Sequence, residues 1–353
     1  MGAVSTDRIF DLDPTIGGQR VESYIYELLD ASHNALGMLD VETNNPRVTL
    51  DASRGVARTC SGVQIPRTTA DDIDTRRHRL RPSLVLSDYS RHSLGVFMFG
   101  NDVRSRLSWG IQWKPDLFDE SFILGQALAR TFSVPKGGSI LTAIAKLYGD
   151  VGFSTISVGV ADQATRTPLI YAGGSLRSDA INALAALLGS YPPYFNNDGI
   201  PTLRPVAVTG APVDHVYEDN THVIEGFTET TGSWYKAPNR YIVTGNDVNA
   251  SIIGVYDIPA IAPNSYANTG VVVTNVTPMQ GVASQAIADT IAYGEALIDT
   301  TSYLQGTFQS TVDSRHDVYD LVQLYGQRYQ ETGWDIACTV GGTMTHNLTG
   351  IYG

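Results

Sequence analysis

The chain has 353 residues, of which 42% are hydrophobic and 17% are charged, and its formal net charge at pH 7 is −12. This composition is typical of a globular protein and excludes a disordered tail, and no run of residues approaches the roughly 20 apolar positions that a membrane-spanning helix needs. A chain this acidic is also a poor general binder of nucleic acid, because neutralisation of phosphates dominates that affinity.

The charge is unevenly distributed along the chain. Between Arg47 and Arg106 there are eleven arginines against six acids, whereas residues 201–353 hold fifteen acids and only five lysines or arginines. A chain polarised in this way can pack a basic surface against an acidic neighbour. The two cysteines, Cys60 and Cys338, are far apart in the sequence, and we expect both to remain thiols in a reducing cytoplasm.

Residues 20–113 are predicted to be β structure. Glycine, proline and asparagine interrupt short alternating or β-branched runs about every ten residues, a pattern typical of a barrel or a sandwich. We place the end of this first domain close to residue 113, ahead of Pro115. The predicted strands are 21–28, 47–50, 83–87 and 96–99.

Two amphipathic helices are predicted between residues 136 and 190. In both, apolar residues recur at i, i+3, i+4 and i+7, a serine precedes them, and a glycine follows. The first helix begins at Ser139 and ends at Gly149; the second begins near Ser175 and Ser178 and ends at Gly189. The apolar residues are Ile140, Ala143, Ile144 and Leu147 in the first helix and Ile181, Leu184, Ala185 and Leu188 in the second.

A β-hairpin is predicted directly after the second helix. Its two extended pieces lie within residues 191–203 and are joined by the turn Asn197-Asp198-Gly199, a sequence that favours positive φ angles. A further strand is expected at 155–160. Together with the two helices these strands predict a small α/β domain.

The last third of the chain is predicted to return to strands, with one helix among them. The helix is expected at roughly 282–299, and the loop 258–270, rich in proline, asparagine and glycine, is expected to be exposed. The predicted strands are 223–227, 240–244, 271–276 and 334–340.

Searches for catalytic and metal-binding motifs identify no catalytic, cofactor-binding or metal-binding residue. The seven histidines have no metal partner at helical spacing, and no GxSxG or HExxH motif is present. The best local cluster of possible ligands is VDHVYEDNTH, which we interpret as an acidic loop between domains, with a cation site as the alternative. Its residues are Asp214, His215, Glu218, Asp219 and His222.

The sharpest local charge feature is the run from Asp74 to Pro82. As a strand it would have no fully apolar face, so we expect an exposed edge or an interface between proteins, with a solvated loop and a nucleic-acid contact as alternatives. The interface residues predicted here are Arg76, Arg77, Arg79 and Arg81.

Aromatic composition also points to interfaces, because the chain has eighteen tyrosines against ten phenylalanines and four tryptophans. Tyrosine combines a rigid apolar ring with a polar tip, which suits protein assembly and carbohydrate stacking alike. Trp234 and Tyr235 are the pair that we predict at such a surface, with ordinary half-buried strand positions as the alternative.

Taken in order, several segments resemble the hub proteins at the tail tip of long-tailed phages, in the form found among minor tail proteins of phages that infect actinobacteria. The resemblance covers roughly residues 70–353. It rests on the strand pair at 71–99, the two Gly-Ser helices, the Asn-Asn-Asp-Gly hairpin with Leu203, the run Asn239 to Gly245, the 282–299 helix and the closing β segment from Asp317 to Met344.

The resemblance implies an α+β fold that is mostly β, with two β-barrel-like hub domains flanking a small α/β domain. The implied divisions are an N-terminal β hub domain at 1–115, a peripheral α/β domain at 116–212 and a C-terminal β hub domain at 213–353. In such hubs three subunits form a ring with pseudo-sixfold symmetry, and the α/β unit projects outward. The chain would then be a structural virion protein without enzymatic activity or cofactor.

The resemblance also implies partners. A homotrimer would join the sixfold tail tube and distal tail proteins to a threefold tip or spike protein, without contact to a membrane, and genomic DNA would pass through its lumen. An acidic lining would keep that DNA from adhering to the wall. The location would be the virion tail tip, after assembly in the host cytoplasm. The alternatives are a virion protein that binds host glycans and a cell-wall glycoside hydrolase.

Overall fold

The computed structural model describes residues 23–55, 57–66, 73–107, 110–208, 210–217, 223–247, 250–282, 284–299 and 303–351. Strands make up most of the regular structure, which confirms a mostly β, α+β chain. The described helices include none that is long and apolar enough to cross a membrane.

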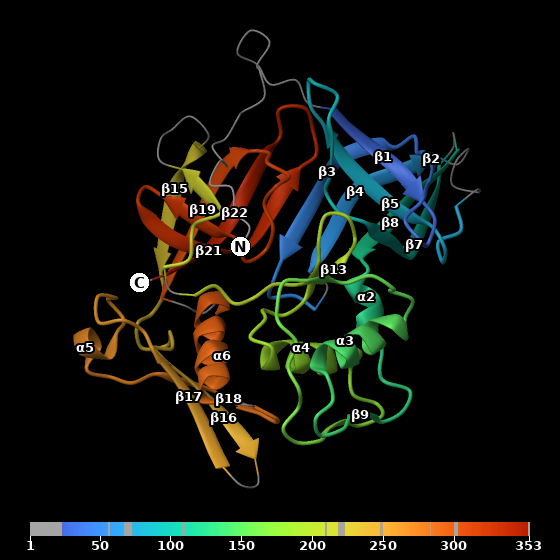
Figure 1. The fold of residues 1–353 in the computed structure, drawn as a ribbon. Helices are drawn as coiled ribbons and strands as arrows, with labels where there is room; N and C mark the ends of the chain where they lie inside the picture. Colours follow the sequence, from blue (N-terminus) through green and yellow to red (C-terminus); the bar gives the residue numbers. More distant parts are fainter. Residues whose placement is uncertain are drawn as a thin grey trace.

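Most strands belong to one large sheet, which Figure 1 shows with the N-terminal strands in blue to teal on the right and the C-terminal strands in red on the left. Within the described residues the strand order is open and does not close into a barrel. The main path is β15 (Val223–Thr231), β19 (Leu304–Thr311), β22 (Thr343–Gly350), β21 (Gln327–Ala337), β3 (Glu42–Asp51), β4 (Arg58–Pro66), β8 (Gly110–Asp119), β7 (Phe97–Leu107), β5 (Arg79–Val85), β1 (Ser23–Leu29) and β2 (Ala35–Met38). Beside this path, β6 (Arg91–Ser93) pairs with β5, while β14 (His215–Tyr217) pairs with β20 (Leu321–Leu324), which in turn pairs with β21.

The antiparallel pairing of β3 with β21 joins the two ends of the chain in this sheet. Val48 lies opposite Ile336, and Leu50 lies opposite Trp334. All four side chains are buried in one core with both cysteines, which are free thiols as predicted. Fully burying an apolar side chain of this size contributes about 1.5–3 kcal/mol, so this seam stabilises the fold as well as connecting it.

A helical part, drawn in green in Figure 1, lies below the large sheet. It confirms the predicted helix pair and hairpin. The Ser139 side chain accepts a hydrogen bond from the N–H of Thr142, as an N-cap should, and Gly199 in the hairpin turn has φ 74°. Its elements are α2 (Ser121–Leu124), β9 (Phe132–Val134), α3 (Ile140–Gly149), β10 (Ser157–Val158), β11 (Leu169–Tyr171), α4 (Arg177–Leu187), β12 (Tyr194–Phe195) and β13 (Pro201–Leu203).

The predicted serine cap of the second helix is wrong. The residue at the N-cap of α4 is Leu176, whose side chain cannot accept a hydrogen bond. The N–H of Arg177 donates instead to the backbone carbonyl of Gln126, at 3.1 Å. A neighbouring backbone carbonyl therefore satisfies a helix-terminal N–H that the sequence pattern assigned to a serine.

A second, smaller sheet follows β15 and carries its own helix. It comprises β16 (Arg240–Asp247), β17 (Ala250–Asp257) and β18 (Thr274–Met279), and it is covered by α6 (Gln285–Ile298), which confirms the predicted 282–299 helix. The short helix α5 (Tyr266–Thr269) lies in the loop that was predicted to be exposed, and Ala262, Asn264 and Ser265 of that loop are in fact buried.

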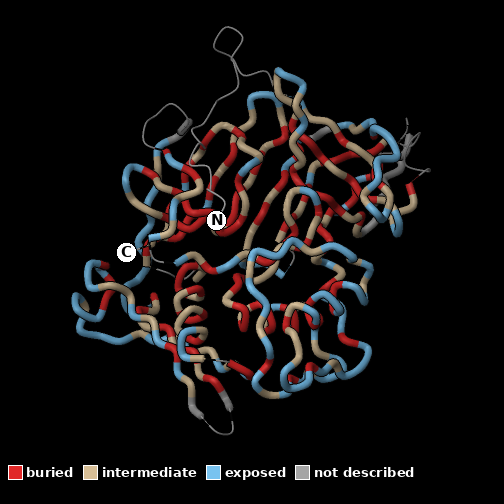
Figure 2. Tube along the Cα trace, viewed as in Figure 1, coloured by how far each residue is buried: buried red, intermediate tan, exposed pale blue. Residues whose placement is uncertain are grey.

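This smaller sheet shares a core with the helical part rather than with the large sheet. Tyr241 and Val243 of β16 and Ala292 of α6 are buried in one cluster with Ile144 of α3 and Leu184 of α4. Figure 2 shows the same arrangement as buried segments running through α6 and the neighbouring helices. The large sheet is thus interrupted in sequence, between β15 and β19, by a segment that packs elsewhere, and the predicted divisions at 115 and 212 stay predictions.

Candidate functional site

The loop between β19 and β20 is the point at which the N-terminal strands, the C-terminal strands and the helical part meet. Four kinds of contact converge there: a buried arginine, an asparagine from the hairpin turn, a group of histidines and a chain of ion pairs. We call residues 312–320 the junction loop.

Arg58 of β4 reaches this junction from the N-terminal strands. Arg58 is only 1% exposed. Its Nη1 donates hydrogen bonds to the carbonyl of Leu94, at 2.7 Å, and to Oδ1 of Asn197. Nη2 lies 3.5 Å from a carboxylate oxygen of Asp317 in the junction loop. The guanidinium also lies over the ring of Trp334, 5.1 Å from its centroid. A buried cation is tolerated only with partners of this kind.

Asn197 of the hairpin turn connects all three parts. Its Nδ2 donates to the carbonyl of Ser314 in the junction loop, at 2.7 Å, and its carbonyl accepts a hydrogen bond from Oγ of Ser93. Together with the hydrogen bond from Arg58, these contacts of the Asn197 side chain and backbone carbonyl hold the hairpin turn against both the N-terminal and the C-terminal strands. The Asn-Asp-Gly sequence therefore serves the junction as well as the turn.

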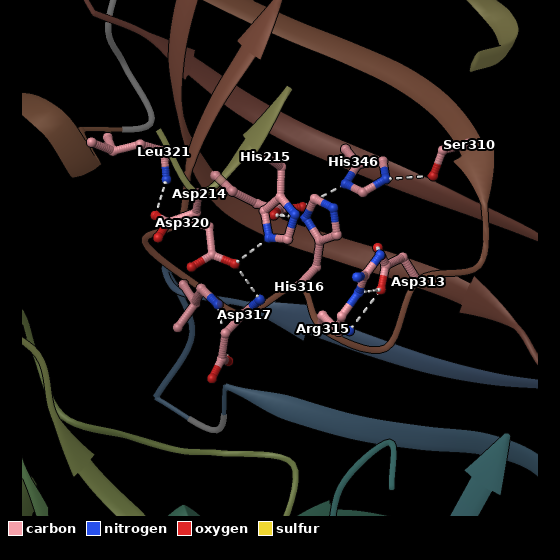
Figure 3. A network of polar contacts seen from close by, with 12 residues as sticks. Asp214, His215, Ser310, Asp313, Arg315, His316, Asp317, Asp320, Leu321 and His346 are labelled. Atoms are coloured by element: carbon pink, nitrogen blue, oxygen red, sulfur yellow. Dashed lines mark hydrogen bonds and ion pairs between the residues drawn. The ribbon is translucent and has the colours of Figure 1, made fainter. Parts of the chain in front are cut away.

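Two histidines share one glutamate behind the junction loop. Nδ1 of His316 lies 2.6 Å from Oε2 of Glu331, and Nδ1 of His346 lies 2.6 Å from Oε1 of the same carboxylate. The other ring nitrogens face hydroxyls: Nε2 of His316 lies 2.8 Å from the hydroxyl of Tyr217, and Nε2 of His346 lies 2.8 Å from Oγ of Ser310. Figure 3 shows His346 between Ser310 and the rest of this network.

Aromatic packing fixes these rings. His215 stacks on His316 with centroids 3.6 Å apart, and His316 meets His346 edge-on at 4.6 Å. Phe308 stacks on the other ring, with its centroid 4.3 Å from that of His346. The side chains of His316, His346 and Glu331 are all 0% exposed.

A chain of ion pairs extends from the histidines to the helical part. Nε2 of His215 lies 3.1 Å from Asp320, and the guanidinium of Arg204 contacts both Asp320 and, at 2.8 Å, Asp214. Asp214 also accepts a hydrogen bond from the N–H of Leu321, at 2.8 Å. Figure 3 shows His215 and Asp320 facing each other, with Asp214 beside the N–H of Leu321.

The electrostatics of His316, His346 and Glu331 follow from their complete burial. Burial alone would lower the pKa of His316, but the adjoining Glu331 carboxylate raises it to about 9. Burial would raise the pKa of Glu331, yet the two histidines hold it below its usual value. For His346, burial and the neighbouring His316 charge outweigh Glu331, so its pKa is lowered. One imidazolium and one carboxylate are the favoured charges here.

Sequence reasoning found only part of this group. Of the predicted cluster, Asp214 and His215 do lie in the network, while Glu218, Asp219 and His222 lie outside the described residues. His316, Glu331 and His346 were missed because the register of β21 and β22 brings Glu331 and His346 together and the junction loop adds His316. The available signal in the sequence was a polar residue at a strand position that faces the core. Glu331 and His346 both occupy such positions, because they lie opposite the buried residues Leu348 and Trp334.

The predicted arginine interface divides into exposed and buried members. Arg76 and Arg77 are exposed and lie beside Asp74. Arg79 is buried and its Nε donates to Glu120 at 2.8 Å, and Arg81 is partly buried against Glu27.

The expectation of an exposed edge strand is wrong. β5 is flanked by β1 and β7, and acids on adjacent elements neutralise its inward-facing charges. Of the exposed aromatic pair, Trp234 is 45% and Tyr235 is 58% exposed, with ring centroids 5.7 Å apart.

A cavity of about 600 Å³ lies between the N-terminal strands and the helical part. Among its lining residues, Glu120 is buried, and its two carboxylate oxygens lie 2.8 Å from Arg79 and 2.9 Å from His33. A carboxylate held this way by two partners is poorly placed to act as the free general acid of a glycosidase.

Comparison with known proteins identifies the fold. No protein-family model matches the sequence, and no curated protein matches it. A tail protein from Neisseria meningitidis has a TM-score of 0.60 at 12% identity, over 92% of this chain and 96% of that one. A 43 kDa prophage tail protein from Shewanella oneidensis also scores 0.60, at 9% identity over 92% and 98% of the two chains.

A third similar structure comes from a secretion system. It is an E. coli type VI secretion component, described as structurally similar to the bacteriophage T4 tail proteins gp27 and gp5. It scores 0.55 at 9% identity, over 92% of this chain and 77% of that one. At identities this low the TM-scores show a shared fold and no more, and at the level of the fold the resemblance to phage tail proteins is confirmed.

Proposed function

We propose that this chain is a structural protein of a phage tail, a hub that forms a homotrimeric ring at the tail tip. The observation that carries the proposal is the fold match to phage tail proteins, which covers more than nine-tenths of both chains. A match over the full length supports a role for the whole subunit, whereas a match confined to one domain would not.

The arrangement of strands supports the ring geometry. One subunit contributes two sets of strands, joined at the β3–β21 seam, and three subunits would place six such sets around a channel. This is the number needed to meet a sixfold tail tube on one side and a threefold tip or spike protein on the other. In this proposal the lumen lets genomic DNA pass, the domains divide at 115 and 212, and the helical part projects outward.

For the contacts between proteins, we retain the four predicted interface residues that the fold leaves accessible. Arg76 and Arg77 are 85% and 81% exposed at their side chains, and Trp234 and Tyr235 are about half exposed. Exposed arginine and aromatic side chains are enriched at the centres of protein interfaces. Arg79 and Arg81 are instead paired within the fold with Glu120 and Glu27.

The absence of enzymatic activity is part of the proposal. In the described network the charged side chains are engaged in structural contacts, and the neighbours with this fold include three phage or prophage tail proteins. The subunit would assemble in the host cytoplasm and remain in the virion.

The test is the mass of the purified full chain by light scattering coupled to gel filtration, followed by electron microscopy. A trimer that forms a threefold ring is the expected result. The variant Trp234→Ala should shift the mass towards monomer, and Tyr89→Ala, a control at an 85% exposed site, should not. A monomer both alone and with tail-tube and tip proteins would overturn the proposal.

A second candidate, a glycan-binding role in host adsorption, is favoured by one observation. Trp234 and Tyr235 present two accessible rings at right angles, 88° apart, and exposed aromatic faces stack on sugars. Binding on a glycan array that Trp234→Ala abolishes would support this candidate, and an array without binding would exclude it.

A further inference from the structure

Three side chains from distant parts of the sequence bring metal-ligand atoms together in the core. The ligand atoms of His316, Glu331 and His346 all lie within 4.8 Å of one another. His316 comes from the junction loop, Glu331 from β21 and His346 from β22. Two imidazole nitrogens and one carboxylate form a donor set that suits divalent zinc and related transition metals.

The imidazole rings are oriented as metal ligands usually are. A histidine that binds a metal through one nitrogen generally engages a second partner through the other, which fixes the tautomer and the ring. Here each Nδ1 faces Glu331, while the Nε2 atoms lie 2.8 Å from Tyr217 and Ser310. Phe308 further restrains His346 by stacking.

The charges around Glu331 leave room for a cation. A carboxylate with no solvent exposure needs a compensating positive charge, and the neighbouring arginines serve other acids. Arg315 pairs with Asp313 at 2.8 Å, and Arg204 pairs with Asp320 and Asp214. Compensation at Glu331 therefore has two sources: a proton on one of the histidines, or a metal ion.

We propose that His316, His346 and Glu331 form a buried structural site for one divalent transition-metal ion, with Zn²⁺ the best match. Each of the three residues offers one ligand atom, which is the number of protein ligands in His₂Glu zinc sites, where a water completes the tetrahedron. Binding displaces the proton that the metal-free group holds between Nδ1 and the carboxylate.

The fit requires only a small adjustment. The nitrogen–oxygen separations are 2.6 Å, whereas ligands on separate residues around tetrahedral zinc, with bonds of about 2.0–2.1 Å, lie about 3.3 Å apart. The Glu331 carboxylate thus needs to retreat by less than about 1 Å, which a side chain with three torsions can do, and the two imidazole nitrogens, which lie within 4.8 Å of each other, need to come to the same separation. The ion would tie the junction loop to β21 and β22.

The experiment uses the untagged full-length chain, stripped with a chelator and then titrated with Co²⁺ and Zn²⁺. One equivalent of Co²⁺ should give the intense visible bands of a low-coordinate site, and Zn²⁺ should displace it. Zn²⁺ should also raise Tm and release protons, seen as a buffer-dependent binding heat. Folded wild-type protein that gives no such bands and no Tm shift would overturn the proposal.

Variants separate this site from adventitious binding. His346→Gln should abolish the Co²⁺ bands, and Ser310→Ala, which removes the partner of Nε2, should weaken affinity about 10–100-fold. His33→Gln, a histidine paired with Glu120 outside the cluster, should leave binding unchanged. If His346→Gln fails to fold, the wild-type and Ser310→Ala titrations still decide. The outcome is independent of whether the chain forms a trimer.

Discussion

The side chain of Asn197 accepts a hydrogen bond from the buried guanidinium of Arg58, although 139 positions separate the two residues. This bond joins a hairpin turn of the helical part to a strand of the large sheet. The same amide donates to the carbonyl of Ser314. One uncharged side chain therefore contributes two of the contacts at the junction.

We expect Asn197→Ala to destabilise the protein by about 3 kcal/mol, because a hydrogen bond to a charged group contributes about 1.5–3 kcal/mol and the partly buried carbonyl of Ser314 also loses its donor. Urea unfolding of the full chain measures the loss. The control is Asn34→Ala, since the Asn34 side chain bonds to Asp30 at an exposed turn. Equal stability of the two variants would contradict the assignment of Asn197 to the junction.

Substitutions in the arginine run should differ strongly in their effect on stability, depending on whether the arginine is buried or exposed. Arg79→Ala leaves the buried Glu120 carboxylate without its 2.8 Å partner, and breaking a buried pair costs about 3–5 kcal/mol. Arg77→Ala removes an 81% exposed side chain, and surface pairs contribute about 0–1 kcal/mol. Thermal and urea unfolding of both variants test this difference; comparable losses would show that Arg79 is not the buried member.

Stability should fall between about pH 4 and pH 6 because of Asp119. Burial raises the pKa of this carboxyl to about 6, so the folded state holds a proton that the unfolded chain releases above its usual pKa of about 3.9. The contribution is present below that value and is lost as the pH rises towards 6, by up to about 3 kcal/mol at 1.36 kcal/mol per pKa unit.

The measurement is the free energy of unfolding of wild type and Asp119→Asn at pH 4, 5, 6 and 7. The difference in free energy of unfolding between wild type and Asp119→Asn should change in favour of the variant as the pH rises, because asparagine does not ionise. Asp116→Asn, an exposed aspartate on the same strand, serves as control. A gap that stays constant with pH would refute the assignment.

The smaller sheet should be sensitive to any side chain at Gly254. A Cβ atom there would lie 2.2 Å from the backbone carbon of Ala288 in α6, so Gly254→Ala must push the helix away from β17. Overpacking of this kind costs about 1–3 kcal/mol, and urea unfolding should show a loss at the upper end. Gly37→Ala, in β2 with open space around it, should change stability by no more than about 0.5 kcal/mol.

Elements with a local pattern were predictable from the sequence, and arrangements set by distant pairing were not. The helix after Ser139 and the turn at Gly199 follow from residue spacing and turn chemistry, and both are present. The smaller sheet could not be separated from the large one, because its strands have the same composition. These strands form a separate sheet because α6 covers β16 and β17, and that contact joins residues too far apart in the sequence to appear in a short stretch of it.

The candidate site was even less accessible to sequence reasoning. His346 and Glu331 are neighbours because β21 and β22 pair in one particular register, and a shift by one residue would turn each side chain to the opposite face. Arg79 likewise looked solvent-exposed because its partner, Glu120, lies 41 positions later. Charge patterns along a chain reveal the cost of burial but not the residue that compensates it.

The β3–β21 seam also constrains the order of events during synthesis. β3 is complete when only about a seventh of the chain has been made, yet one of its edges has no partner until residues 333–337 emerge. An unpaired strand edge is a template for pairing with other chains, and contacts of such long range form slowly. Nascent or truncated chains that lack β21 should therefore aggregate, and chaperones that shield strand edges should improve the yield of soluble subunit.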